Sequence, residues 1–177
     1  MPQLIAPTAR VHASFLAAMD EFRAEGHGSA ARKSTMAREI REYHGRWDDP
    51  AVFAGYIRML ADGMAGESQG RGAVTTLWYV DGDEYLGRLS VRHRLTPALL
   101  ELGGHIGYGV RPSARRRGHA TGMLRASLPV VHSLGIDPVL VTCDVGNTAS
   151  RRVIEACGGE LEDERGGKLR YWIATAG

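Results

Sequence analysis

The chain has 177 residues, of which 44% are hydrophobic and 24% are charged. This composition is ordinary for a soluble globular protein with a sizeable core, and it excludes a largely disordered chain. The formal net charge of +2 is too small to indicate nucleic acid or a membrane as a general partner. No apolar run is long enough to span a membrane, and the first residues do not resemble a signal peptide, so we expect a cytoplasmic protein.

Cysteine and histidine usage gives no sign of a disulfide framework or a metal site. Cys143 and Cys157 do not form a CxxC pair, so we expect them to be two small buried hydrophobic side chains. The seven histidines include no HExxH motif or comparable ligand spacing. We therefore expect no metal.

The first 72 residues predict mainly helices. A short strand is expected at residues 3–6, and apolar side chains then recur at helical spacing in 8–25, 34–44 and 50–64. Asp49 and Pro50 favour the start of the third helix, because they supply a capping side chain and a proline in the first turn.

Two strands are predicted next, at residues 73–80 and 84–95, with a hairpin turn at Asp81-Gly82. Polar and apolar side chains alternate along the second strand. The residues on its apolar face are Leu89, Val91 and Leu95, and those on its polar face are Arg88, Ser90, Arg92 and Arg94. We interpret the arginine-rich face as the solvent side of a sheet.

A strand, a helix and another strand are expected in the second half. HIGYGV at 105–110 is the first strand, the helix begins at about Gly118 and ends near Gly135, and PVLVTCD at 138–144 is a nearly continuous apolar run. Such a run is typical of a strand covered on both faces and parallel to the preceding strand. The buried stripe predicted for the helix is Met123, Leu124, Leu128, Val131 and Leu134.

The remaining residues predict one more helix and a hairpin. Asn147 is expected to cap the helix, with Ala149, Val153 and Cys157 on its inner side. A hairpin follows at 160–163 and 168–174. Because no repeat, linker or second hydrophobic pattern interrupts the sequence, we expect a single domain.

Two motifs of other protein classes are rejected on their context. GESQG at 66–70 matches the GxSxG elbow of serine hydrolases, but a helix precedes it and a strand follows, the reverse of what a nucleophilic Ser68 needs. The glycines at 103, 104, 107 and 109 miss GxGxxG spacing, and GGK at 166–168 lacks the other residues of a P-loop. Neither class is supported.

The stretch YGVRPSARRRGHAT at 108–121 has the character of an anion site. It joins a strand to a helix, where free backbone N–H groups and the positive end of the helix dipole converge. Gly118 and the small Ala120 allow close approach of a phosphate, and Thr121 adds a hydroxyl donor. A solvated basic turn is the alternative interpretation of the three arginines.

This stretch resembles the acyl-CoA pyrophosphate loop of the GNAT superfamily of N-acyltransferases. Arg115, Gly118 and Ala120 occupy the three fixed places of that loop, and CDVGNTASRRVIEACGG at 143–159 resembles the family's next strand end, asparagine and helix. The resemblance implies an α/β fold: a mixed, mostly antiparallel sheet with one splayed parallel strand pair, flanked by helices. It further implies one domain over 1–177, with a helical substrate-side part at 1–72 and an acyl-CoA-binding core at 73–177.

The resemblance also implies an activity: transfer of the acetyl group of acetyl-CoA to a primary amine of a small molecule or peptide, by direct attack and without a metal. The backbone N–H of Val110 would stabilise the oxyanion. The residues implied for binding acetyl-CoA are Tyr108, Gly109, Val110, Arg115, Arg116, Arg117, Gly118, His119, Ala120, Thr121, Asn147, Ser150 and Arg152. Ile154 stands where relatives often carry a tyrosine acid, so the general acid is unassigned.

Several assignments stay open at this point. His105 is our prediction for the general base, Glu101 is the next candidate, and Tyr108 would donate to the thiolate if its hydroxyl faced the cleft. The arginine-rich strand face would favour an acceptor that carries a carboxylate or phosphate. The alternatives are a catalytically silent acyl-CoA-binding domain and a nucleic-acid module that uses residues 111–117. Monomer and homodimer are both open.

Overall fold

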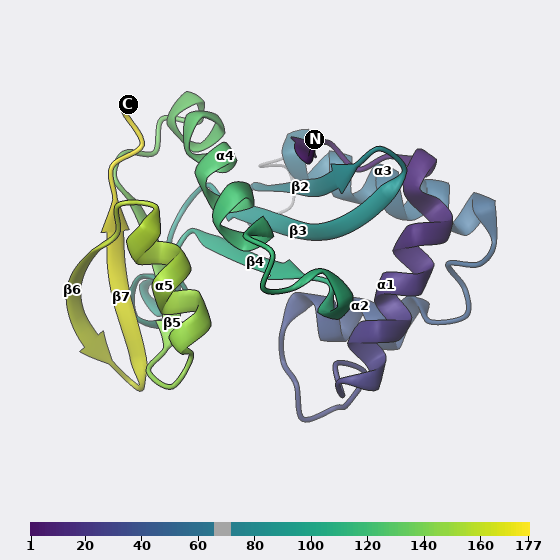
Figure 1. Cartoon of the computed structure of the whole chain (residues 1–177), viewed down its shortest axis with the longest axis horizontal. Coiled ribbons are helices and arrows are strands. Elements are labelled where there is room, and N and C mark those ends of the chain that lie inside the picture. Colours follow the sequence, from purple (N-terminus) through teal and green to yellow (C-terminus); the bar gives the residue numbers. More distant parts are fainter. Residues whose placement is uncertain (66–71) are drawn as a thin grey trace.

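The computed structural model of the chain describes residues 1–65 and 72–177. Its strands are β1 (Gln3–Ile5), β2 (Val74–Asp81), β3 (Glu84–Arg92), β4 (Ile106–Val110), β5 (Val139–Asp144), β6 (Glu160–Arg165) and β7 (Lys168–Ile173). They form one seven-stranded sheet with the order β1-β2-β3-β4-β5-β7-β6 (Figure 1). All neighbouring strands are antiparallel except β4 and β5, which are parallel.

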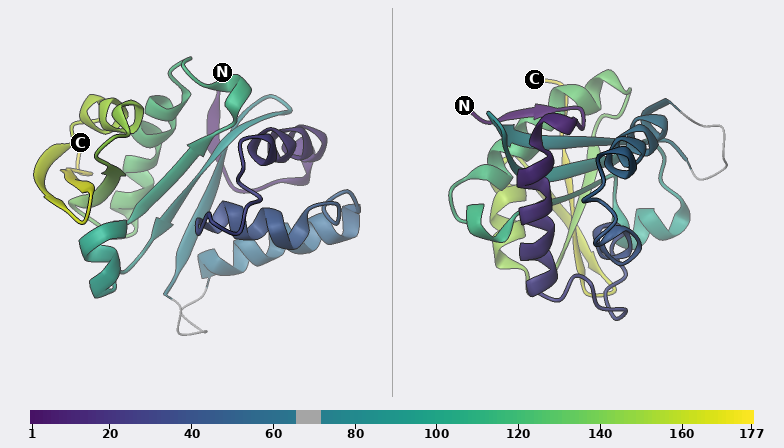
Figure 2. Two further views of the ribbon diagram at one scale, coloured as in Figure 1. Left: turned by 90° about the horizontal axis from the view of Figure 1, so that it is seen from below. Right: turned by 90° about the vertical axis from the view of Figure 1, so that its right-hand side faces the viewer.

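Helices cover both faces of this sheet. They are α1 (His12–Ala24), α2 (Thr35–Tyr43), α3 (Pro50–Ala65), α4 (His119–Ser133) and α5 (Thr148–Ala156), with short helical turns η1 (Ala9–Val11), η2 (Leu99–Gly103) and η3 (Pro112–Ala114). Figures 1 and 2 show α1, α2 and α3 together at one side and α4 and α5 at the other. The predicted fold, a mostly antiparallel sheet with one parallel pair between helices, is confirmed.

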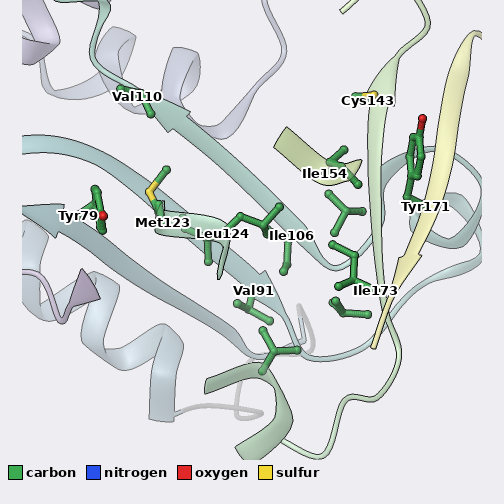
Figure 3. Packing of buried hydrophobic residues seen from close by; sticks show 14 of the residues in the cluster. Tyr79, Val91, Ile106, Val110, Met123, Leu124, Cys143, Ile154, Tyr171 and Ile173 are labelled. Atoms are coloured by element: carbon green, nitrogen blue, oxygen red, sulfur yellow. The ribbon is translucent and has the colours of Figure 1, made fainter. Parts of the chain in front are cut away.

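Two hydrophobic clusters correspond to the two faces. On the α4–α5 face, Leu89, Leu124 and Ile154 belong to a cluster that joins both halves of the sheet, and Figure 3 shows its members from β3 and β4 opposite those from β7. On the α1–α3 face, an aromatic cluster surrounds Phe15 and Trp78. The alternation of side chains along β2 explains the division, because successive residues point to opposite faces.

The sheet divides between β4 and β5. Ile106 and Val141 form the one residue pair of this ladder within the described chain, and just before it the N–H of His105 donates to Leu140 O at 2.8 Å. On its other edge β5 pairs with β7 along its whole length, from Val139 to Asp144, whereas β4 contributes no further pair beyond Ile106 and Val141 in the described residues. Figure 1 shows β4 running away from β5, with α4 bridging the two halves. The parallel strands therefore splay apart and leave the far end of β4 without a neighbour on this side.

Some details of the sequence interpretation are wrong. Leu134 is 36% exposed, because it is the C-cap of α4 and no longer faces the sheet. In α5, Ile154 is the buried residue, whereas Ala149 is exposed in the first turn. The strand predicted at 84–95 ends at Arg92. Ser68, rejected above as a nucleophile, lies outside the described residues.

Candidate active site

A cleft of about 1170 Å³ lies where β4 leaves β5. One wall comes from β4, the turn after it and the first turns of α4 and α5, and the other comes from β3, the end of α1 and the start of α2. All the residues predicted to bind acetyl-CoA line this cleft except Arg117. They come from three separate segments of the chain, which the splayed strands bring together.

The backbone of β4 offers free hydrogen-bonding groups to the cleft. The N–H of Arg111 donates to Leu86 O at 2.8 Å, and the N–H of Arg92 donates to His105 O at 2.7 Å. In an antiparallel ladder the bonds to one neighbour fall on alternate residues, so the odd-numbered residues of β4 bond to β3. The N–H groups of Tyr108 and Val110 therefore point toward β5, which has already turned away.

The turn before α4 directs further N–H groups into the same cleft. Gly118 is the N-cap of α4 with φ 82°, and Arg116 also has a positive φ, of 60°. A Cβ added at Gly118 would have no atom within 4 Å. The N–H groups of the first helical turn have no partner inside the helix, and the helix dipole makes this end positive. Left-handed backbone at a non-glycine residue costs free energy, and such strain is concentrated at functional turns.

The three arginines of the turn have different environments. Arg115 forms a two-pronged ion pair with Glu25, at 2.7 and 2.8 Å, and its Nε donates to Val110 O at 3.1 Å. Arg115 therefore contacts mainly α1 and β4, and its guanidinium group is already engaged within the protein and not free for a phosphate. Arg116 lines the cleft, whereas Arg117 is exposed outside it.

Tyr108 and Ser150 form a hydroxyl pair on the cleft wall. Their oxygens are 2.6 Å apart, and Ser150 is held in the first turn of α5 by its own N–H, which donates to Asn147 Oδ1 at 3.1 Å. Burial raises the pKa of Tyr108 to about 12, although the hydrogen bond from Ser150 acts in the opposite direction. The tyrosine is thus protonated at neutral pH and can donate. Asn147 caps the helix and lines the cleft as well.

Neither residue predicted as the general base lines the cleft. His105 is buried at the start of β4, and its Nδ1 accepts the N–H of Leu140 at 3.0 Å. Burial lowers its pKa. Glu101 belongs to η2 and forms an ion pair with Arg165 at 2.8 Å. Both roles stay predictions, without support from these positions.

A buried ion pair replaces the expected solvent face of β3. Arg88 is 7% exposed and Glu39 is 6% exposed, with 2.5 Å between Nη1 and Oε2. The hydroxyl of Tyr56 donates to the same carboxylate oxygen at 2.8 Å. The interpretation of Arg88 as solvent-exposed is wrong, because α1, α2 and α3 cover this face. A signal was present in the sequence: Glu39 lies within the apolar stripe of Met36, Ile40 and Tyr43.

Residues 24–160, which make up most of the chain, match the family model described as an acetyltransferase (GNAT) domain. The chain belongs to the GNAT acetyltransferases. It is accordingly an acyl-CoA-dependent N-acyltransferase, as its loop at 115–120 predicted. Among curated proteins, none matches this GNAT sequence.

Solved structures of other acetyltransferases share the GNAT fold of this chain. RimL, a ribosomal L7/L12 alpha-N-protein acetyltransferase in complex with coenzyme A, has a TM-score of 0.65 at 16% identity, covering 99% of this chain and 96% of its own. Mycobacterium smegmatis RimJ has a TM-score of 0.65 at 19% identity, covering 98% and 81%. The microcin C7 self-immunity acetyltransferase MccE, solved with acetyl-CoA and AMP, has a TM-score of 0.64 at 14% identity, covering 98% and 92%.

The described part of the chain contains neither a membrane-spanning helix nor a metal-binding cluster. No helix there has both the length and the apolar character needed to cross a membrane. No group of three or more histidine, cysteine or acidic side chains is arranged there to hold a metal ion. Cys143 and Cys157 are free thiols, of which only Cys143 is fully buried.

Proposed function

We propose that the cleft binds acetyl-CoA and transfers its acetyl group to a primary amine of a small molecule or peptide. The observation that carries the proposal is the meeting of two donor sets in one cleft: the open edge of β4 and the N-terminus of α4. The first suits an extended pantetheine arm, which would pair with β4 as a further strand would. The second suits a pyrophosphate.

The β4 edge also supplies the donors for the reaction. The amine nitrogen attacks the thioester carbon, the C–N bond forms, and the C–S bond breaks as the sulfur leaves with its electron pair. The N–H groups of Tyr108 and Val110 are placed to stabilise the negative charge on the carbonyl oxygen. The ammonium form of the acceptor loses one proton to a base or to water before the attack. The nitrogen loses a second proton after it has bonded to the acetyl carbon, and that proton ends on water or on the departing sulfur.

The hydroxyl pair of Tyr108 and Ser150 is our candidate for the donor to the leaving thiolate. A thiol has an ordinary pKa of about 8.5, so the thiolate is a tolerable leaving group and needs a hydrogen bond more than a full proton transfer. The pair lies on the cleft wall. The resemblance to the family would place the donor at the position of Ile154 in α5. The hydroxyl pair would take over from the tyrosine that Ile154 replaces.

The acceptor is an amine, and the neighbours support both of its classes. RimL is named for acetylating a protein N-terminus, and MccE was solved with AMP beside acetyl-CoA. Their identities to this chain are too low to transfer either substrate.

The second candidate is a catalytically silent acyl-CoA-binding domain, favoured by Ile154, which is fully buried in α5 and offers no proton. A single experiment separates the two. Purified protein is incubated with acetyl-CoA and a panel of primary amines, and free CoA thiol is measured. Transfer predicts amine-dependent thiol release that Tyr108→Phe lowers about tenfold with acetyl-CoA affinity unchanged. Binding of acetyl-CoA with no release for any amine would favour the silent domain.

A further inference from the structure

The acceptor half of the cleft, on the side away from α4 and α5, has a floor without side chains. Gly107 and Gly109 pair with Ser90 and Arg88 across the β3–β4 ladder, and paired residues point to the same face. A Cβ at Gly107 would meet no atom within 4 Å, and one at Gly109 would meet only Met36, at 3.9 Å. The glycines thus leave an open channel over β4 toward the N–H groups of Tyr108 and Val110.

The carboxylates around this channel are already neutralised. Glu25 is the one acidic residue among the described residues that line the cleft, and Arg115 holds both of its oxygens. The carboxylate of Glu39 is bound by Arg88. An ammonium group without other charges would therefore find no free acidic partner there.

Two guanidinium groups lining the channel, by contrast, lack an acidic partner in the described residues. Arg92 lies on the same face as Arg88, and Nη1 donates to Gly104 O at 3.2 Å. Arg32, which precedes α2 on the same wall, contacts Glu25 O and His27 Nε2, each at 3.4 Å. Ser34, Thr35 and Ser90 also line this region.

Of the two arginines, Arg92 has the greater need of a negatively charged partner, because it is half-buried. Burial lowers its pKa, and no nearby carboxylate opposes the effect. A desolvated cation without a counter-charge is unfavourable unless a ligand supplies one. A carboxylate or phosphate matches the planar donor set of arginine well.

We propose that the acceptor is an amine that also carries an anionic oxygen group, a carboxylate or a phosphate, bound by Arg92 with help from Arg32. This rests on the proposed function, because it assigns the acceptor class of the same cleft. Three residues, about 10 Å of strand, separate His105, which faces Arg92, from Tyr108. The guanidinium group donates to Gly104 O, one residue farther from Tyr108 than His105 is, so the arginine does not shorten that span and several bonds should separate the amine from the anion. Polyamines and strongly basic peptides are disfavoured.

The test uses matched pairs of amines on the full chain saturated with CoA, with binding measured by calorimetry. One pair is phosphoethanolamine and ethanolamine, and the other is γ-aminobutyrate and its amide, so that phosphate and carboxylate are compared separately. We expect the anionic member of at least one pair to bind tenfold or more tightly. Arg92→Gln should remove that preference, whereas Arg38→Gln, an exposed arginine of α2 outside the cleft, should retain it.

The outcomes separate the two proposals. Three results would each overturn the anionic acceptor. Two of them are equal binding within both pairs and an unchanged preference in Arg92→Gln. The third is that neither anionic member binds up to about 10 mM, which corresponds to a very weak affinity. Failure of CoA itself to bind would overturn the proposed function. In that event the same pairs are titrated into the free protein, where a preference lost in Arg92→Gln would still support the anion site.

Discussion

The two sides of the cleft are built in different ways. The side that faces α4 and α5 consists largely of backbone: the edge of β4, the left-handed turn at Gly118 and the capped start of α5. The side that faces α1 and α2 consists of side chains from distant segments, among them Arg88, Arg92 and Arg32. Binding by backbone groups demands a few small residues at fixed spacing, whereas binding by side chains demands only that the segments fold together.

This difference determines which residues on each side of the cleft can be substituted. A backbone site for an invariant ligand tolerates many side chains around it, as long as glycine and the helix start are kept. A side-chain site can change its ligand by a single substitution. The first side should therefore determine whether acetyl-CoA binds, and the second should determine which amine is acetylated.

Among the substitutions proposed here, Glu39→Ala should have the largest effect, which is a loss of stability on the α1–α3 side of the sheet. The substitution leaves Arg88 buried without its counter-charge, and breaking a buried pair in this way costs about 3–5 kcal/mol. Urea unfolding should show the loss, and Glu42→Ala, an exposed residue of the same helix, should be close to neutral. Because Glu39 does not line the cleft, acetyl-CoA should still bind to the folded fraction. Stability within 1 kcal/mol of wild type, an allowance on the scale of surface substitutions, would contradict the assignment.

Gly118→Val should reduce acetyl-CoA affinity by about 100-fold, which is about 2.7 kcal/mol. Its side chain would occupy the open space at the start of α4 and also strain a residue with φ 82°. Gly135→Val is the matched control, since Gly135 has φ 78° and open space at the other end of the same helix. Both variants should lose similar stability, but only Gly118→Val should lose the ligand. Equal affinities in the two variants would place the pyrophosphate elsewhere.

Substitutions of His105 can show whether this residue has a catalytic role or only supports the structure. We expect His105→Ala to lower stability by about 1–3 kcal/mol, because the N–H of Leu140 loses its acceptor, and His105→Asn to restore part of it. Burial lowers the folded-state pKa of His105, so the unfolded chain binds more protons below about pH 6.5 and wild-type stability falls on acidification. Denaturant unfolding from pH 7.5 to 5.5 should show a smaller fall in His105→Asn.

Turnover supplies the other half of that comparison. A general base at His105 would make both variants about 100-fold slower and would remove the acidic limb of the pH–rate profile. Since His105 lies outside the cleft lining, we expect the limb to remain in His105→Asn. Its disappearance would restore His105 as the base.

The smallest effect concerns the exposed arginines of the turn. Arg116→Gln should weaken acetyl-CoA binding by roughly fivefold to tenfold through loss of one charge-assisted contact. Arg117→Gln should change affinity by less than about twofold, because Arg117 does not line the cleft. Calorimetry at two salt concentrations would measure both, and a larger effect at Arg117 would reverse the assignment.

Sequence patterns were sufficient for the backbone side of the cleft. The strand at 105–110, the glycine before α4 and the apolar run at 138–144 each follow from local propensity, and a parallel pair joined by a helix has few possible arrangements. The prediction of an anion site at 115–121 rests on the free N–H groups that accompany any helix start.

The side-chain part of the cleft could not be predicted in the same way. The burial of Arg88 depends on how α2 packs over β3, which brings Glu39 within 2.5 Å across 49 residues of sequence. Similarly, the direction of the His105 ring depends on its bond to Leu140, a neighbour that exists only once β5 is in place. Such contacts depend on docking of whole elements, and a single carboxylate in an apolar stripe indicates a partner without naming it.

Thermal unfolding with and without acetyl-CoA tests the central claim, that the cleft between β4 and β5 is an acetyl-CoA site, most directly. At a ligand concentration 100 times the dissociation constant, binding to the folded state adds about 2.7 kcal/mol. For a domain of this size that corresponds to a rise in Tm of about 5–10 °C. We expect such a rise in wild type and in Gly135→Val, and its loss in Gly118→Val. An unchanged Tm of the wild-type protein at millimolar acetyl-CoA, on the order of 1000 times a micromolar dissociation constant, would contradict the claim.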